Sequence, residues 1–138
     1  MATLFETSDD ELLASVYQKQ GRTLDDLPYT PDFEAIFAAV TGDESASGRA
    51  QLFRRLHNLR KAGKLPRLGK AKESPPRLAA EHEAIVTGLV EAEVGQLSKR
   101  DQLPYTEGFD RVVAGLNSRA ALSLSPHDVW RVVAKLAK

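Results

Sequence analysis

The chain has 138 residues, of which 42% are hydrophobic and 28% charged, and its 19 basic side chains balance its 19 acidic ones. This composition is typical of a globular protein and argues against a disordered or fibrous chain. The chain has no cysteine, which excludes disulfides and thiolate zinc sites and suits a reducing compartment, so we expect a cytoplasmic protein. It has neither a signal peptide nor the roughly 20 apolar residues of a membrane span, so we expect no membrane association.

The first predicted helix covers residues 8–20. Ser8 and Glu11 have the spacing of a capping box at its start, and Gly21 is a stop signal at its end. Apolar side chains recur through this segment at helical spacing: Leu12, Leu13, Val16 and Tyr17.

A second and a third helix follow in the first half of the chain. Thr30 before Pro31 is typical of an N-cap with proline at the first helical position, because proline has no amide hydrogen to leave unbonded there. The second helix then has an apolar face of Phe33, Ile36, Phe37 and Val40. After the polar turn "TGDESASG", the third helix has a buried stripe of Leu52, Phe53, Leu56 and Leu59, with Gly63 as its C-cap signal.

The sequence pattern in the second half of the chain predicts three more helices. One lies in residues 78–94 and ends near Gly95. Thr106 caps the next, whose apolar face is Phe109, Val112, Val113 and Leu116. Ser125 before Pro126 starts the last one.

The two halves share a phrase, "DDLPYTPDFE" from Asp25 and "DQLPYTEGFD" from Asp101. The match continues into the last helix of each half, where Phe53 aligns with Trp130 and Arg54 with Arg131. Self-similarity over about forty residues is typical of a duplicated supersecondary unit. We therefore predict an all-α protein of two tandem three-helix units from an internal duplication, 1–70 and 78–138, packed together.

The basic, proline-rich segment between the units is "KLPRLGKAKESPPR". Its glycine and proline interruptions predict an exposed linker over 71–77, with a short extended β-arm after the third helix as an alternative for its start. The repeated tyrosines, Tyr29 and Tyr105, are expected to be packing residues, since a phenol ring buries well and its hydroxyl needs only one partner.

Charge is unevenly distributed along the chain. Residues 1–48 hold two basic and ten acidic side chains, whereas residues 49–77 hold ten basic and one acidic. A local excess of nine positive charges over 29 residues is the pattern expected of a phosphate-binding surface.

The third helix carries the chemistry for such a surface. With its leucines inward, four side chains that hydrogen-bond base edges fall on the opposite face: Gln51, Arg54, Asn58 and Lys61. A short helix, a turn and a basic third helix, over about residues 8–70, resemble the trihelical helix-turn-helix and winged-helix-like superfamily in architecture. The turn is longer than the usual three or four residues. The resemblance implies binding of double-stranded DNA, favoured over RNA, with phosphate contacts from Arg60, Lys64, Arg67 and Lys70.

Other functions stay open. In the second half, the positions equivalent to the basic stripe are Asp128, Arg131, Lys135 and Lys138, and a carboxylate faces phosphate badly, so only one copy is expected to bind. The acidic first third could instead fold back onto the arginines and mask them. The alternative function is a protein-interaction adaptor, with a groove lined by Tyr29, Phe33, Tyr105 and Trp130.

Catalysis is not expected. The three histidines, His57, His82 and His127, lie on different predicted elements, and neither a metalloprotease motif nor a glycine-rich phosphate loop is present. No cofactor or metal site is implied, and the oligomeric state is not determined by the sequence.

Overall fold

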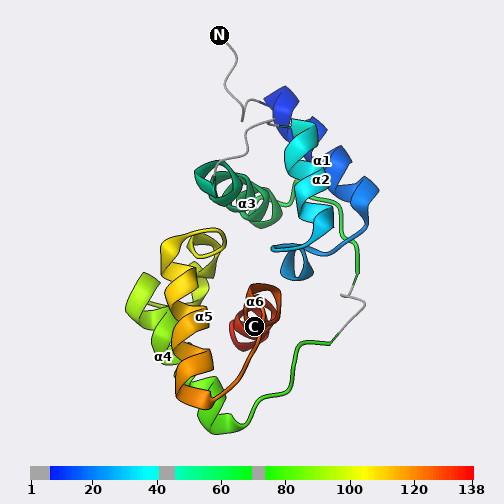
Figure 1. Cartoon of the computed structure of the whole chain (residues 1–138). Coiled ribbons are helices and arrows are strands. Elements are labelled where there is room, and N and C mark those ends of the chain that lie inside the picture. The colour runs from blue at the N-terminus through cyan, green and yellow to red at the C-terminus, as the bar shows by residue number, and fades with distance from the viewer. Residues whose placement is uncertain (1–6, 41–45, 70–73) are drawn as a thin grey trace. The chain divides into compact units, whose positions relative to one another are not determined.

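A computed structural model describes residues 7–40, 46–69 and 74–138. The chain divides into two compact units, Met1–Ala71 and Lys72–Lys138, and each is described by itself. The described residues are mostly helical and contain no strand, so the all-α prediction is confirmed (Figure 1). Residues 64–69 have no regular structure, and the alternative of a β-arm is therefore wrong over these residues. Within the described ranges, no helix is both long and apolar enough to cross a bilayer.

Unit 1 has the order α1 (Thr7–Gln20), η1 (Leu24–Asp26, a short 3-10 helix), α2 (Pro31–Val40) and α3 (Ala46–Lys61), and α1 contacts both α2 and α3. Helix α1 is described from Thr7, and the side chain of Ser8, predicted to form a capping box, lies outside the described part of the structure. Gly21 ends α1 as expected, with a left-handed φ of 69° and its amide donating to the Tyr17 carbonyl.

The core of unit 1 is built from the predicted stripes. Leu12 is 48% exposed while its neighbour Leu13 is buried, and Val16 is only half-buried. The buried stripe of α1 is therefore narrower than predicted. The other buried apolar residues come from every helix of the unit: Tyr17, Leu24, Leu27, Phe33, Ile36, Phe37, Leu52, Phe53, Leu56 and Leu59.

Unit 2 repeats the order of elements, with α4 (Ala80–Val94), η2 (Leu97–Gln102), α5 (Glu107–Ala120) and α6 (Pro126–Leu136). Helix α4 lies against α5 and also contacts α6 and η2 (Figure 1). Gly95 ends α4 with a left-handed φ of 91°, and Ser125 caps α6 as predicted, its hydroxyl accepting from the Asp128 amide at 3.1 Å. The buried core of unit 2 comes from α4, α5 and α6 and from Leu103, which directly follows η2: Val86, Val90, Leu103, Phe109, Val112, Leu116, Val129, Trp130, Val132 and Val133.

The repeated LPYT phrase forms the same local structure in both units. In each, the threonine hydroxyl donates to the carbonyl of the leucine three residues earlier at 2.6 Å and accepts from the phenylalanine amide three residues later at 3.2 Å. Tyr29 and Tyr105 both have φ of 65°, a left-handed conformation that costs an ordinary residue free energy. The two phrases share one conformation, whereas a duplication as its origin stays a prediction.

We expect the cap threonines to stabilise their units unequally. Thr30→Ala and Thr106→Ala each remove an N-cap bond, at a cost of about 1 kcal/mol in the free energy of unfolding. Thr30→Ala should cost more, because Thr30 is buried whereas Thr106 is half-buried, and groups left without a hydrogen-bond partner cost more where water cannot replace it. Urea denaturation checks this, with Thr→Ser at each site as the control that keeps the cap; equal losses would contradict the burial argument.

The α4–α5 contact includes an ion pair between Glu93 and Arg111, from which we expect a pH-dependent contribution to stability. Both carboxylate oxygens of Glu93 accept from Arg111, from Nε and from Nη2, at 2.9 Å. These hydrogen bonds hold the pKa of Glu93 below its usual range. Because the folded pKa is the lower one, the stabilisation is present above about pH 5 and is lost as pH falls through the folded pKa.

We therefore expect Glu93→Gln to lower the free energy of unfolding at neutral pH and to match the parent protein at about pH 2 to 3. Urea denaturation over this pH range measures the difference. Glu91→Gln removes an exposed carboxylate from the same helix and serves as the control. A loss that is the same at every pH would show that the ion pair is not its source.

Candidate nucleic-acid interface

Helix α3 has sharply different faces. Leu52, Phe53 and Leu56 are fully buried, and Leu59 is 3% exposed. The side chains on the opposite face are all exposed: Gln51, Arg54, Asn58 and Lys61. At about 100° per residue these four positions form one continuous stripe, so the structure places the predicted base-reading residues together.

Two arginines at the edges of this buried face are paired with carboxylates of α1 and α2. Arg49 makes a bidentate contact to Glu34, with Nη2 2.7 Å from Oε1, and its guanidinium carbon lies 4.7 Å from the centroid of the Phe37 ring. Arg55 pairs with Asp10 of α1. These positions flank the buried stripe, so their side chains reach the neighbouring helices instead of solvent.

Arg60 is the third paired arginine of α3. Its Nη1 donates to Oδ1 of Asp25 at 3.1 Å, and its Nη2 donates to Nε2 of His57 at 2.9 Å. His57 is almost fully buried beside Phe53, so it holds the guanidinium from the core side. The predicted phosphate contact Arg60 is therefore turned away from the exposed stripe and toward η1.

The acidic side chains of the first third therefore mask only part of the basic surface. They form ion pairs with the arginines that flank the buried stripe of α3 and, among the described residues, with none of the basic side chains on the exposed stripe. Within the described ranges, five basic side chains of unit 1 have no carboxylate partner, and all five are exposed: Lys19, Arg54, Lys61, Lys64 and Arg67. Lys19 lies on α1, Arg54 and Lys61 lie on the stripe, and Lys64 and Arg67 lie on the irregular segment after α3. Lys70 lies outside the described residues.

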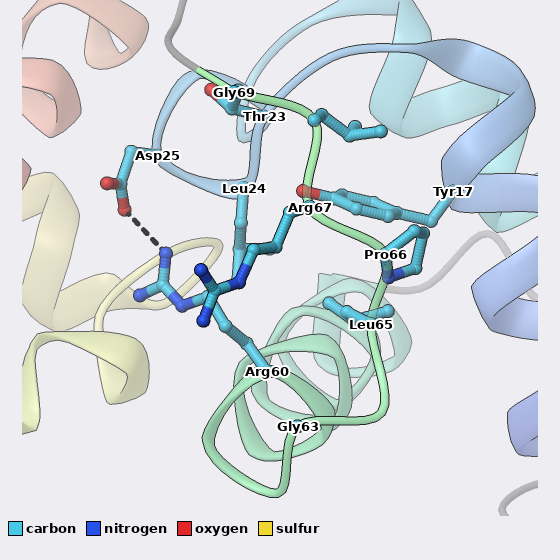
Figure 2. Close-up of a pocket in the computed structure, with 11 residues that line it drawn as sticks. Tyr17, Thr23, Leu24, Asp25, Arg60, Gly63, Leu65, Pro66, Arg67 and Gly69 are labelled. Carbon is cyan, nitrogen blue, oxygen red and sulfur yellow. Dashed lines mark hydrogen bonds and ion pairs between the residues drawn. The ribbon is translucent and has the colours of Figure 1, made fainter.

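A pocket opens at the carboxyl end of α3, inside unit 1. Its volume is about 430 Å³, and the segment after α3 passes over η1 and α1 to form its walls (Figure 2). Gly63 makes the necessary reversal with φ of 73°, while the Lys64 amide donates to the Leu59 carbonyl at 2.8 Å. The pocket is lined by Tyr17, Thr23, Leu24, Asp25, Arg60, Gly63, Leu65, Pro66, Arg67, Leu68 and Gly69.

Helix α6 of unit 2 offers no equivalent stripe. Arg131, the counterpart of Arg54, is buried, and Lys135 pairs with Glu83 of α4 at 3.2 Å. Asp128 is half-buried in the first turn, and Lys138 follows the end of the helix. Helix α6 therefore differs from α3 by burial as well as by sequence.

The aromatic residues predicted to line a protein-binding groove, in the alternative adaptor function, have little exposed surface. Phe33 and Trp130 are both fully buried in their own units, so neither is available to a partner. Tyr29 and Tyr105 are half-buried and both make contacts within the protein. Of the described residues, no three from histidine, cysteine, aspartate and glutamate are grouped as a metal site would require.

Searches of family models, of curated proteins and of solved structures find no match to this chain. Residues 41–45, between α2 and α3, lie outside the described ranges, so the turn of a helix-turn-helix is not available for comparison. The site is therefore interpreted from its own geometry.

Sequence reasoning missed the pocket. Tyr17 was expected only in the apolar stripe of the first helix, yet it lines the pocket together with the segment after α3. A usable signal was the pair of leucines and the proline in "KLPRLG", which are unusual in a solvated linker.

Proposed function

We propose that unit 1 binds double-stranded DNA through the exposed face of α3. Arg54, Asn58 and Lys61 enter the major groove, with Gln51 beside them and Lys64 on a phosphate. The observation that supports this most is that only some basic side chains of α3 are ion-paired. Carboxylates pair with the flanking arginines, while Arg54 and Lys61 are exposed to solvent beside the amide side chains of the stripe.

The chemistry of the stripe suits base edges. Arginine and lysine donate to the guanine acceptors, and asparagine and glutamine bond adenine in a bidentate way. A helix of 16 residues is about 24 Å long, enough to lie in a major groove with three or four side chains on the bases. The paired arginines contribute rigidity, since they fasten α3 to α1 and α2 and keep the stripe facing outward.

Salt dependence tests this function. Three cations brought to the duplex, Arg54, Lys61 and Lys64, should give a slope of log affinity against log salt of about −2 to −3, since each phosphate neutralised contributes about −0.9. Fluorescence anisotropy of a labelled random duplex, at 50 to 200 mM salt, measures this slope. Absence of binding at the lowest salt would overturn the proposal and favour a protein partner.

A further inference from the structure

We propose that the pocket at the carboxyl end of α3 binds a small phosphate monoester with an apolar body. This site is separate from the exposed stripe of α3 and does not depend on the DNA proposal. A volume of about 430 Å³ lies within the range of small-molecule sites in proteins. All of its walls belong to unit 1, so one unit is sufficient to form it.

The polar end of the pocket carries net positive charge. Figure 2 shows the side chains of Arg60 and Arg67 both extending toward Asp25, which gives two guanidinium groups and one carboxylate. Arg60 is already oriented by His57 and Asp25, and Arg67 has no ion-pair partner among the described residues. A planar guanidinium with several donors is well suited to phosphate oxygens.

A hydroxyl lining the pocket also lacks a partner. Oγ1 of Thr23 is buried and makes no hydrogen bond to a described residue. A buried hydroxyl without a partner costs free energy, and a ligand oxygen would relieve that cost. This hydroxyl would supply a further hydrogen-bond donor to a ligand oxygen in the pocket, in addition to the guanidinium groups.

The other walls of the pocket are largely apolar, which is why we propose a ligand with an apolar group. Leu24, Leu65, Pro66 and Leu68 line the pocket together with the ring of Tyr17. Burial keeps the Tyr17 hydroxyl protonated by raising its pKa, so this wall adds no negative charge. A ligand with both a phosphate and an apolar group would use both kinds of wall, whereas inorganic phosphate would use only one.

Calorimetric titration of the full chain with phenyl phosphate tests the site, with inorganic phosphate and benzyl alcohol as the two partial probes. We expect phenyl phosphate to bind at least about tenfold more tightly than either, because only it uses the charged and the apolar walls together. Equal affinity for all three, or no binding of phenyl phosphate, would overturn the proposal.

Substitution of residues that line the pocket tests whether phenyl phosphate binds there. Arg67→Ala and Thr23→Val should each weaken phenyl phosphate, by about tenfold or more for the arginine, because a charge-assisted hydrogen bond is lost. Lys64→Ala removes a nearby exposed charge that does not line the pocket and should leave the affinity within about twofold. An equal loss in Arg67→Ala and Lys64→Ala would show diffuse charge attraction and overturn the site.

The two proposals can fail separately. The Arg54→Ala, Asn58→Ala, Lys61→Ala variant lies outside the pocket lining and should keep its affinity for phenyl phosphate. Loss of phenyl phosphate binding in this variant would place the anion on the α3 stripe and overturn the pocket assignment, whatever the DNA measurement shows.

Discussion

Replacing Arg54, Asn58 and Lys61 together with alanine is expected to weaken binding to a duplex by about a hundredfold at 50 mM salt. Each side chain is expected to contribute about 1 kcal/mol, and the two lost charges should reduce the salt slope by up to about 2. All three residues are exposed, and alanine is the better helix former, so the fold should be kept. Anisotropy titrations of parent and variant at several salt concentrations measure both effects.

A matched control removes the same kinds of side chain from unit 2. Lys99→Ala, Gln102→Ala and Arg119→Ala together also delete one lysine, one arginine and one amide, all exposed. We expect this control to change affinity by less than about threefold, since only screened, non-contacting charges are lost. If both triple variants lose affinity equally, binding depends on overall charge and α3 is not the reading surface.

The largest effect on stability is expected from Trp130→Ala, which should lower the free energy of unfolding of unit 2 by about 3 to 5 kcal/mol. Trp130 is fully buried, and its ring meets that of Phe109 edge to face, with centroids 6.3 Å apart and planes at 72°. Alanine would leave a cavity at the centre of a small core that has little other apolar area to replace it. Urea denaturation followed by circular dichroism measures the loss, because the variant has no tryptophan left to fluoresce.

Trp130→Phe is the control for this prediction. It keeps a ring against Phe109 and most of the buried volume, so we expect it to lose about 1 to 2 kcal/mol. A loss below about 1 kcal/mol for Trp130→Ala would contradict the central position of this side chain in the core of unit 2.

The candidate interface was predictable where it depended on helical periodicity. The positions of Leu52 and Leu56 determine that Arg54 and Asn58 face the other way, because a helix turns by a fixed angle per residue. The partners of the flanking arginines were not predictable, since Asp10 and Asp25 lie 45 and 35 residues away from theirs along the chain. Only the packing of α1 and η1 against α3 brings them within reach.

The local structure of the repeated LPYT phrase was also predictable only in part. Its threonines were predicted as N-caps from their place before a helical pattern, and both accept the expected amide. The left-handed tyrosines were not predicted, because tyrosine rarely adopts positive φ and nothing local requires it. The cap bonds and the packing around the phrase hold that conformation in both units.

By itself, the sequence determined the helices, the caps at Thr30, Thr106 and Ser125, most of the buried stripes and the local excess of positive charge, because these follow from interactions within a few residues. Tertiary structure decided which charges remain exposed, and it formed the pocket. Arg54 and Arg131 occupy equivalent positions of the repeat, yet one is exposed and the other buried. The exposure of each charge and the formation of the pocket both depend on contacts between segments that are distant in the chain. The free energy of such contacts is set by burial and by distance in space, which local sequence patterns do not contain.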